Sequence, residues 1–214
     1  MTATLPRPEY PRPQFERSDW LNLNGAWDFA YDDGDTGVTA RWYEAGPFGQ
    51  TIQVPFAFQS RLSGIGDTAI HDIVWYRRGF DLPAGWADQR ILLHFGAVDY
   101  AADVWVNGVH VTRHEGGHVG FGCEITPYVT PSGNTVVVRA QDDTLDRTLP
   151  RGKQYWRAQS ESIFYTRTTG IWQTVWLEAV PTTHLAGVRM TPDLDARQVA
   201  MDFTVAGPPK GQLE

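Results

Sequence analysis

The sequence contains a single cysteine, Cys123, among its 214 residues. An internal disulfide is therefore excluded, and metal sites built on clusters of cysteine have no ligands. Basic residues are also in the minority, with 18 Lys and Arg against 25 Asp and Glu and a formal net charge of −7. Nucleic acids and anionic membranes bind clustered positive charge, so we expect neither as a partner.

Long apolar runs are missing as well. No stretch approaches the roughly 18 apolar residues of a membrane-spanning helix. The first residues, MTATLPRPEYPRP, lack the apolar segment of a secretory signal. We therefore expect a cytoplasmic protein, although a fragment would have lost a signal that preceded it. The sequence also lacks the G-x-S-x-G motif that would mark a serine nucleophile.

Aromatic residues are abundant instead. They make up 13% of the chain and include 9 Trp, beside 21 Gly and 14 Pro. This composition favours β-sheets joined by tight turns. Short, regularly spaced strands with almost no helical pattern predict an all-β fold, an antiparallel β-sandwich. The number of strands favours a jelly roll.

The clearest local signal is the Asn107-Gly108 pair between two alternating runs, which predicts a hairpin with a two-residue turn. Such a turn fixes the register, and the expected pairs are Val106 with Val109, Trp105 with His110, Val104 with Val111 and Asp103 with Thr112. One face of the hairpin is then core (Ala102, Val104, Val106, Val109, Val111) and the other is wet (Asp103, Trp105, His110, Thr112, His114). His110 and His114 would lie about 13 Å apart along the strand, too far to share one metal ion.

Changes in spacing divide the chain into three parts. Residues 1–19 are rich in proline and charge and predict an extended arm. Residues 20–181 hold the predicted sandwich, including a long polar stretch at 143–162, and loops of such length are more often functional than idle. Residues 182–214 predict two strands of a new sheet, and two strands alone leave an apolar face and both edges open. We therefore expect these last residues to begin a second domain.

Five segments, in this order along residues 20–180, resemble the N-terminal sugar-binding domain of glycoside hydrolase family 2. They are LNLNGAWDF, VWYRRGF, FGAVDYAADVWVNG, HEGGHVGF with EITPYV after it, and TGIWQTVWLE. The resemblance implies a galactose-binding-domain-like jelly roll, then an immunoglobulin-like sandwich, then a (β/α)₈ barrel with two catalytic glutamates. The motifs of both glutamates are missing here, so the resemblance implies no catalytic residue in this chain and no activity of the chain alone. From the single cysteine and the spacing of the histidines we expect no metal site, and we expect no cofactor.

Retaining glycosidases use a close pair of carboxylates. Acidic pairs are present, such as Asp142 with Asp143 and Glu161 near Asp146, but nothing in the sequence marks them as buried. We interpret them as solvated loop charges.

The resemblance also implies substrate contacts. In the family's β-galactosidases an asparagine before the xxWxNG strand reaches the sugar, and Asp99 takes its place here. A family aspartate six residues before the Gly-Ile of the last strand is replaced by Phe164, which cannot bind a hydroxyl group. This departure argues against β-galactosidase or β-glucuronidase specificity. It suggests a platform of Trp156, Phe164 and Tyr165, with Arg167, that stacks on a sugar or aglycone. The alternatives are a turn cap for Asp99 and core packing for the aromatic residues.

The sequence thus predicts a domain that supplies substrate contacts to a barrel outside this chain. Its expected partners are a β-glycoside and that barrel, with a homo-oligomer as a further option. Two rival hypotheses remain open, namely a free-standing carbohydrate-binding module and a purely structural or oligomerisation domain.

Overall fold

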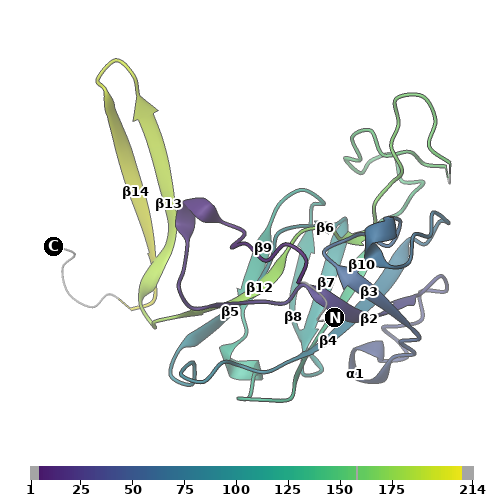
Figure 1. Ribbon diagram of the computed structural model, residues 1–214, viewed down its shortest axis with the longest axis horizontal. Helices are drawn as coiled ribbons and strands as arrows, with labels where there is room; N and C mark the ends of the chain where they lie inside the picture. Colours follow the sequence, from purple (N-terminus) through teal and green to yellow (C-terminus); the bar gives the residue numbers. More distant parts are fainter. Residues whose placement is uncertain (1–4, 158, 209–214) are drawn as a thin grey trace.

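Alternating apolar residues build two antiparallel sheets that face each other across one core (Figure 1). The computed structural model describes residues 5–157 and 159–208. The four-stranded sheet has the order β1 (Trp20–Asn22), β12 (Val175–Val180), β5 (Arg90–Phe95), β9 (Phe121–Glu124). The six-stranded sheet has the order β3 (Gln50–Val54), β2 (Gly25–Tyr31), β4 (Ile73–Phe80), β10 (Asn134–Gln141), β7 (Ala101–Val106), β8 (Val109–Glu115). The predicted antiparallel β-sandwich is confirmed.

Short elements complete the sandwich. The strands β6 (Val98–Asp99) and β11 (Gly170–Ile171) pair with each other beside the main sheets. Within the described residues, helical structure is limited to α1 (Trp42–Ala45) and to three 3₁₀ turns at Pro13–Phe15, Arg61–Ser63 and Thr126–Tyr128. In the part of the chain that is described, no helix is long and apolar enough to cross a membrane.

The core follows the period of two that strands impose on side chains. In β5, Ile91, Leu93 and Phe95 are buried, and the residues between them are only partly covered. The central strands of the six-stranded sheet supply the facing layer, including Val104, Val136 and Val138.

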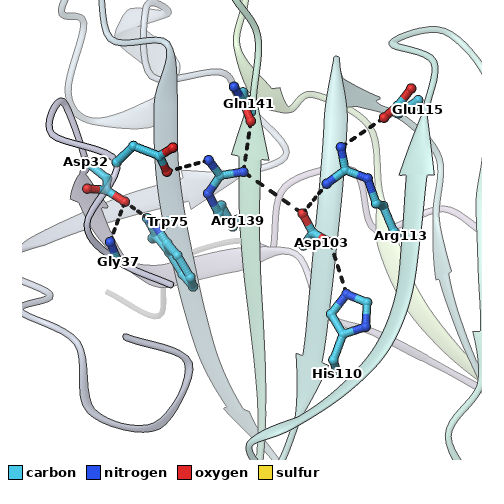
Figure 2. A network of polar contacts seen from close by, with 10 residues as sticks. Asp32, Gly37, Trp75, Asp103, His110, Arg113, Glu115, Arg139 and Gln141 are labelled. Atoms are coloured by element: carbon cyan, nitrogen blue, oxygen red, sulfur yellow. Dashed lines mark hydrogen bonds and ion pairs between the residues drawn. The ribbon is translucent and has the colours of Figure 1, made fainter. Parts of the chain in front are cut away.

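The outer face of the six-stranded sheet carries a second, smaller apolar cluster and a polar network. Trp75, Trp105 and Val137 are buried there beneath the segment that includes α1. Asp32 holds this segment down, because its carboxylate accepts hydrogen bonds from Gly37 N and Trp75 Nε1, each at 2.9 Å. Arg139 lies on the same face (Figure 2). Its Nη1 atom donates to Gln141 Oε1 at 3.0 Å and lies 4.0 Å from Asp103 Oδ2.

The β7–β8 hairpin has the predicted turn but only part of the predicted register. Val106 pairs with Val109 and Trp105 with His110, as expected. A β-bulge follows, so Val104 pairs with Thr112 and not with Val111. One inserted residue moves every later side chain to the other face.

Several hairpin side chains lie in other surroundings than expected, and the bulge accounts for His114, which lies beyond it. His114 lies on the core side and stacks on Phe121 at 4.3 Å, whereas His110 stays outside against Asp103. Trp105, expected on a wet face, is buried under the α1 segment, and Val109, expected in the core, is 46% exposed.

The N-terminal arm crosses the outer face of the four-stranded sheet and is held there by one buried acid. Glu178 of β12 is fully buried and accepts hydrogen bonds from Tyr10, Arg12 and Arg17 of the arm. Arg17 also donates to the carbonyl of Leu185 at the start of the next hairpin.

That hairpin, β13 (His184–Asp193) and β14 (Gln198–Ala206), forms a two-stranded sheet of its own that projects from the sandwich (Figure 1). Both strands were expected from the sequence. The division of the chain at residue 181 and the idea of a second domain remain predictions, and residues 1–4 and 209–214 of the predicted arm and second domain lie outside the described residues.

Candidate functional site

Asp99 lies at the end of β6, where it pairs with Gly170 of β11. Its side chain is 4% exposed, and its Oδ2 atom accepts a hydrogen bond from Gln154 Nε2 at 2.7 Å. Thr168 Oγ1 donates to the same oxygen at 3.4 Å. The other oxygen packs against Gly117, where an added Cβ would come within 2.1 Å of it. Burial raises the pKa of Asp99.

Gln154 connects Asp99 to the long loop between β10 and β11. While its amide nitrogen donates to Asp99, its Oε1 atom accepts from Thr168 N at 2.7 Å. Beside it, Tyr155 N donates to Tyr165 O at 2.8 Å, so the two arms of the loop pair with each other. Figure 1 shows the loop reaching away from the sandwich at the upper right. Asp99 therefore anchors the loop through one amide side chain.

Two of the predicted platform residues come together on this loop, and they bring in a third aromatic ring. Trp156 and Phe164 lie 5.2 Å apart, and Tyr155 stacks on Phe164 at 5.1 Å. Trp156 is 39% exposed and Phe164 half-buried, whereas Tyr155 is buried. Tyr165 is 66% exposed on the same loop and contacts none of these three rings face to face.

Arg167, the fourth member of the predicted platform, turns away from the aromatic rings. It is 3% exposed and donates hydrogen bonds to the carbonyls of Thr68 and Ala69 in the connection before β4. Burial lowers the pKa of this guanidinium, and the negative charges of Asp72 and Asp142 partly offset that effect. Arg167 thus fixes the loop from below.

Asp142, which the sequence led us to treat as a solvated loop charge, belongs to this buried base. Burial and then the neighbouring charges of Asp99 and Asp72 raise its pKa to about 7. Thr169 Oγ1 donates to it at 3.4 Å, a weak compensation. A useful sequence signal was its place directly after β10, where the chain leaves the sheet beside Asp99.

This end of the molecule consists of a loop with exposed aromatic rings above a polar base, an arrangement suited to binding a ligand. Asp99 is buried and Asp142 is half-buried beneath the loop, so the two carboxyl groups do not form an open pair like that of a glycosidase. Within residues 5–157 and 159–208, no group of three His, Cys, Asp or Glu side chains is placed to hold a metal ion. What the loop offers to a ligand is its exposed aromatic rings.

A sequence profile described as "Glycosyl hydrolases family 2, sugar binding domain" matches residues 21–181. The chain belongs to this family. The match ends one residue past β12, so the β13–β14 hairpin lies outside the family 2 sugar binding domain.

Several relatives of this family 2 chain are named β-glucuronidases. The dog protein is 32% identical over 92% of this chain, and the pig protein is 31% identical over 86%. The chain spans about a third of the length of these relatives, 34% and 32% respectively. A β-glucuronidase of Ruminococcus gnavus in complex with uronic isofagomine superposes with a TM-score of 0.72 at 24% identity, covering 94% of this chain and 35% of that one. This last likeness establishes the fold.

Proposed function

We propose that the chain supplies one wall of the substrate site of a larger family 2 glycosidase that hydrolyses β-glycosides. The observation that carries the proposal is the long β10–β11 loop, which presents partly exposed aromatic rings and is tied at its base to Asp99 through Gln154. Flat rings stack on the apolar faces of sugars, and a fixed base keeps such rings in place.

In this proposal the loop residues divide into two groups. Trp156, Phe164 and Tyr165 contact the glycoside or its aglycone directly, because they retain exposed surface. Asp99 and Arg167 act from below, and they reach a hydroxyl group only when the loop moves off them. The β-glucuronidase names of the relatives make β-glucuronides the substrates to try first, although Phe164 stands where the family aspartate was expected.

The rest of the enzyme forms part of the same proposal. The sandwich is a jelly roll, β13 and β14 open an immunoglobulin-like domain, and the catalytic glutamates lie on a barrel beyond it. The share of the relatives' length that the chain spans supports this division, and the single cysteine supports a location in the cytoplasm. Association into a homo-oligomer stays a lesser part of the proposal.

The test replaces loop residues in a full-length family 2 enzyme that carries this domain. We expect Tyr165→Ala and Trp156→Ala each to raise KM for a chromogenic β-glucuronide by about three- to tenfold with little change in kcat, because a stacking contact is worth roughly 0.5–1.5 kcal/mol. Tyr128→Ala is the matched control, since Tyr128 is also exposed at 38% but lies on another loop.

Kinetics unchanged by both substitutions would overturn the role of the loop. The isolated 214-residue chain should not hydrolyse the same substrate. Turnover by the pure chain would show that it does contain a catalytic pair of carboxylates and would contradict this part of the proposal. Saturable binding of the glycoside by the chain alone would favour the rival interpretation as a free-standing carbohydrate-binding module.

A further inference from the structure

The outer face of the six-stranded sheet has a hollow of about 590 Å³ at the end of the sandwich away from Asp99. Asp99 precedes β7 and Asn107 follows it, and a strand of six residues spans about 20 Å. The lining residues are Tyr43, Glu44, Arg77, Asn107, Gly108, Val109 and Thr135. They come from α1, from β4 and β10, and from the β7–β8 turn, so the hollow is built by the fold and not by one loop.

Tyr43 gives this hollow a fixed aromatic surface. Its ring lies parallel to Trp105, 5.3 Å away with an interplanar angle of 5°, and Trp105 stacks in turn on Trp75 at 5.3 Å. Trp75 and Trp105 are buried, whereas Tyr43 is half-buried and lines the hollow. An aromatic ring that is immobilised by stacking loses little entropy when a ligand packs on it.

Arg77 gives the hollow a fixed polar group. Its Nε and Nη2 atoms donate to Asp28 Oδ2 at 3.0 and 2.9 Å, and its guanidinium lies 4.7 Å from the centre of the Phe48 ring. Among the described residues, no hydrogen bond is made by Arg77 Nη1 or by Asp28 Oδ1. The pair is therefore held in place and still has a donor and an acceptor for a ligand.

Arg77 also lines a second hollow of about 450 Å³, so the two hollows meet at its side chain. Asp28 pairs with Thr51 of β3 and with Arg77 of β4, and Arg77 pairs with Val137 of β10, so these residues form one row across four strands. Neighbouring strands are about 4.8 Å apart, so this row is roughly 14 Å long. Together the hollows suit an extended ligand that crosses the strands.

The charges in the two hollows decide what kind of ligand fits. Asp28 and Glu44 balance Arg77 and Arg78, which leaves no net charge to attract a polyanion or a polycation. Val109 is the large apolar residue that the first hollow exposes, so little apolar surface is offered to a protein partner. Hydroxyl groups pair with carboxylates, guanidinium and amides alike, and the apolar face of a pyranose ring packs on an aromatic ring.

We propose that this outer face binds a neutral oligosaccharide, which lies across β3, β2, β4 and β10 with one sugar ring on Tyr43 and hydroxyl groups on Arg77 and Asp28. The site holds a glycan chain and performs no chemistry on it. It does not depend on the role of the β10–β11 loop, because the two surfaces share no residue.

The test titrates the ¹⁵N-labelled 214-residue chain with neutral tetrasaccharides, namely cello-, xylo-, manno- and maltotetraose, and follows amide chemical shifts. At least one of them should bind with a Kd of about 10 mM or lower and should shift the amides of residues 26–28, 43–44, 77–79 and 135. Tyr43→Ala should weaken that binding by about tenfold, as the loss of one stacked ring implies.

Because Tyr43 also covers Trp105, a second substitution that leaves the ring stack intact is needed. Thr135→Arg fills the floor of the hollow from a half-buried position and should abolish binding. Leu194→Ala, an exposed position in the turn between β13 and β14, is the control and should leave the affinity unchanged. Absence of binding by all four tetrasaccharides would overturn the proposal, as would shifts confined to residues 154–168. An affinity that Thr135→Arg leaves intact would overturn it as well.

Discussion

Two carboxyl groups that the fold covers, Glu178 fully and Asp142 in part, behave in opposite ways. Glu178 lies under the N-terminal arm and Asp142 lies under the β10–β11 loop. Burial pushes the pKa of both groups upward. For Glu178, the His94 imidazole 3.4 Å away and hydrogen bonds from Trp176 and Tyr10 outweigh burial and hold the pKa far below its ordinary value. For Asp142, burial is reinforced by Asp99 and Asp72, and the pKa rises to about 7.

The difference shows that donors, and not depth alone, decide whether a buried acid stabilises the fold. Glu178 is satisfied by donors from the arm and from its own sheet, so it holds the arm in place. Asp142 has the 3.4 Å contact from Thr169 and two acidic neighbours, so its charged form costs stability. Shifted pKa values of the second kind are common at functional sites, which agrees with the function proposed for the loop.

The largest expected effect comes from replacing Glu178, the buried acid whose charge is satisfied by several donors. Glu178→Gln should lower the free energy of unfolding at pH 7 by about 3 kcal/mol, because Arg12 and Arg17 lose a buried counter-charge. Urea denaturation measures the loss. Trypsin cleavage after Arg17 should become faster as the arm is released.

The matched control is Glu124→Gln in the same sheet. Glu124 also pairs with an arginine, Arg90, but its side chain is 32% exposed, so the expected loss is below about 1 kcal/mol. Equal losses in the two variants would refute the claim that the buried cluster is special. The contribution of Glu178 should be present above pH 4.5, its ordinary value, and should be lost as the pH falls further.

The second largest effect comes from replacing Asp142, because the substitution removes a charge that has few hydrogen-bond donors. Because the pKa of Asp142 is about 7 in the folded protein and 3.8 ordinarily, the folded state holds the proton more tightly between these values. Stability should therefore fall as the pH rises from about 4 to about 7, and the cost should be complete above pH 7. Asp142→Asn should remove this dependence and stabilise the protein at pH 8 by roughly 2 kcal/mol.

Denaturation curves at pH 5, 6, 7 and 8 test this sign. Asp143→Asn is the control, since Asp143 is the exposed neighbour in sequence. If Asp142→Asn destabilises the protein at pH 8 as much as at pH 5, the charged form of Asp142 is not a cost.

The smallest effect comes from replacing Gln154, which links Asp99 to Thr168 at the base of the loop. Gln154→Ala removes the bonds to Asp99 and to Thr168 N and should cost about 1 kcal/mol. It should also speed amide hydrogen exchange in residues 165–169 and leave the arm at 10–17 unaffected. Exposed Gln173→Ala is the control, and equal exchange in the two variants would mean that Gln154 does not hold the loop.

The parts of the fold that follow local rules could be predicted from the sequence. The Asn107-Gly108 turn and the alternating core residues of β5 and β10 are set by neighbouring residues, and they were found where expected. The bulge in β8 was missed because nothing local marks which residue is inserted. As a result, His114 was predicted on the wrong face of the hairpin.

The site was predicted less completely, because its features depend on residues far apart in the sequence. That Asp99 is covered follows from Gln154, 55 residues later, and from Gly117 packed against it. The apolar character of β12 predicts a buried strand, and the burial of Glu178 there depends in part on Tyr10, Arg12 and Arg17, which come from the arm. The periodicity of apolar residues along the sequence does not reveal contacts between residues so far apart.

The central claim is that Asp142, at the base of the β10–β11 loop, has too few hydrogen-bond donors for its charged form, whereas Glu178, under the arm, has enough. A ¹³C NMR titration of side-chain carboxyl groups, following Asp142 and Glu178 in one sample of the 214-residue chain, tests it most directly. We predict an apparent pKa of about 7 for Asp142 and no titration of Glu178 above pH 4. Titration of Asp142 near its ordinary value of 3.8, or of Glu178 at 4.5 or above, would contradict it.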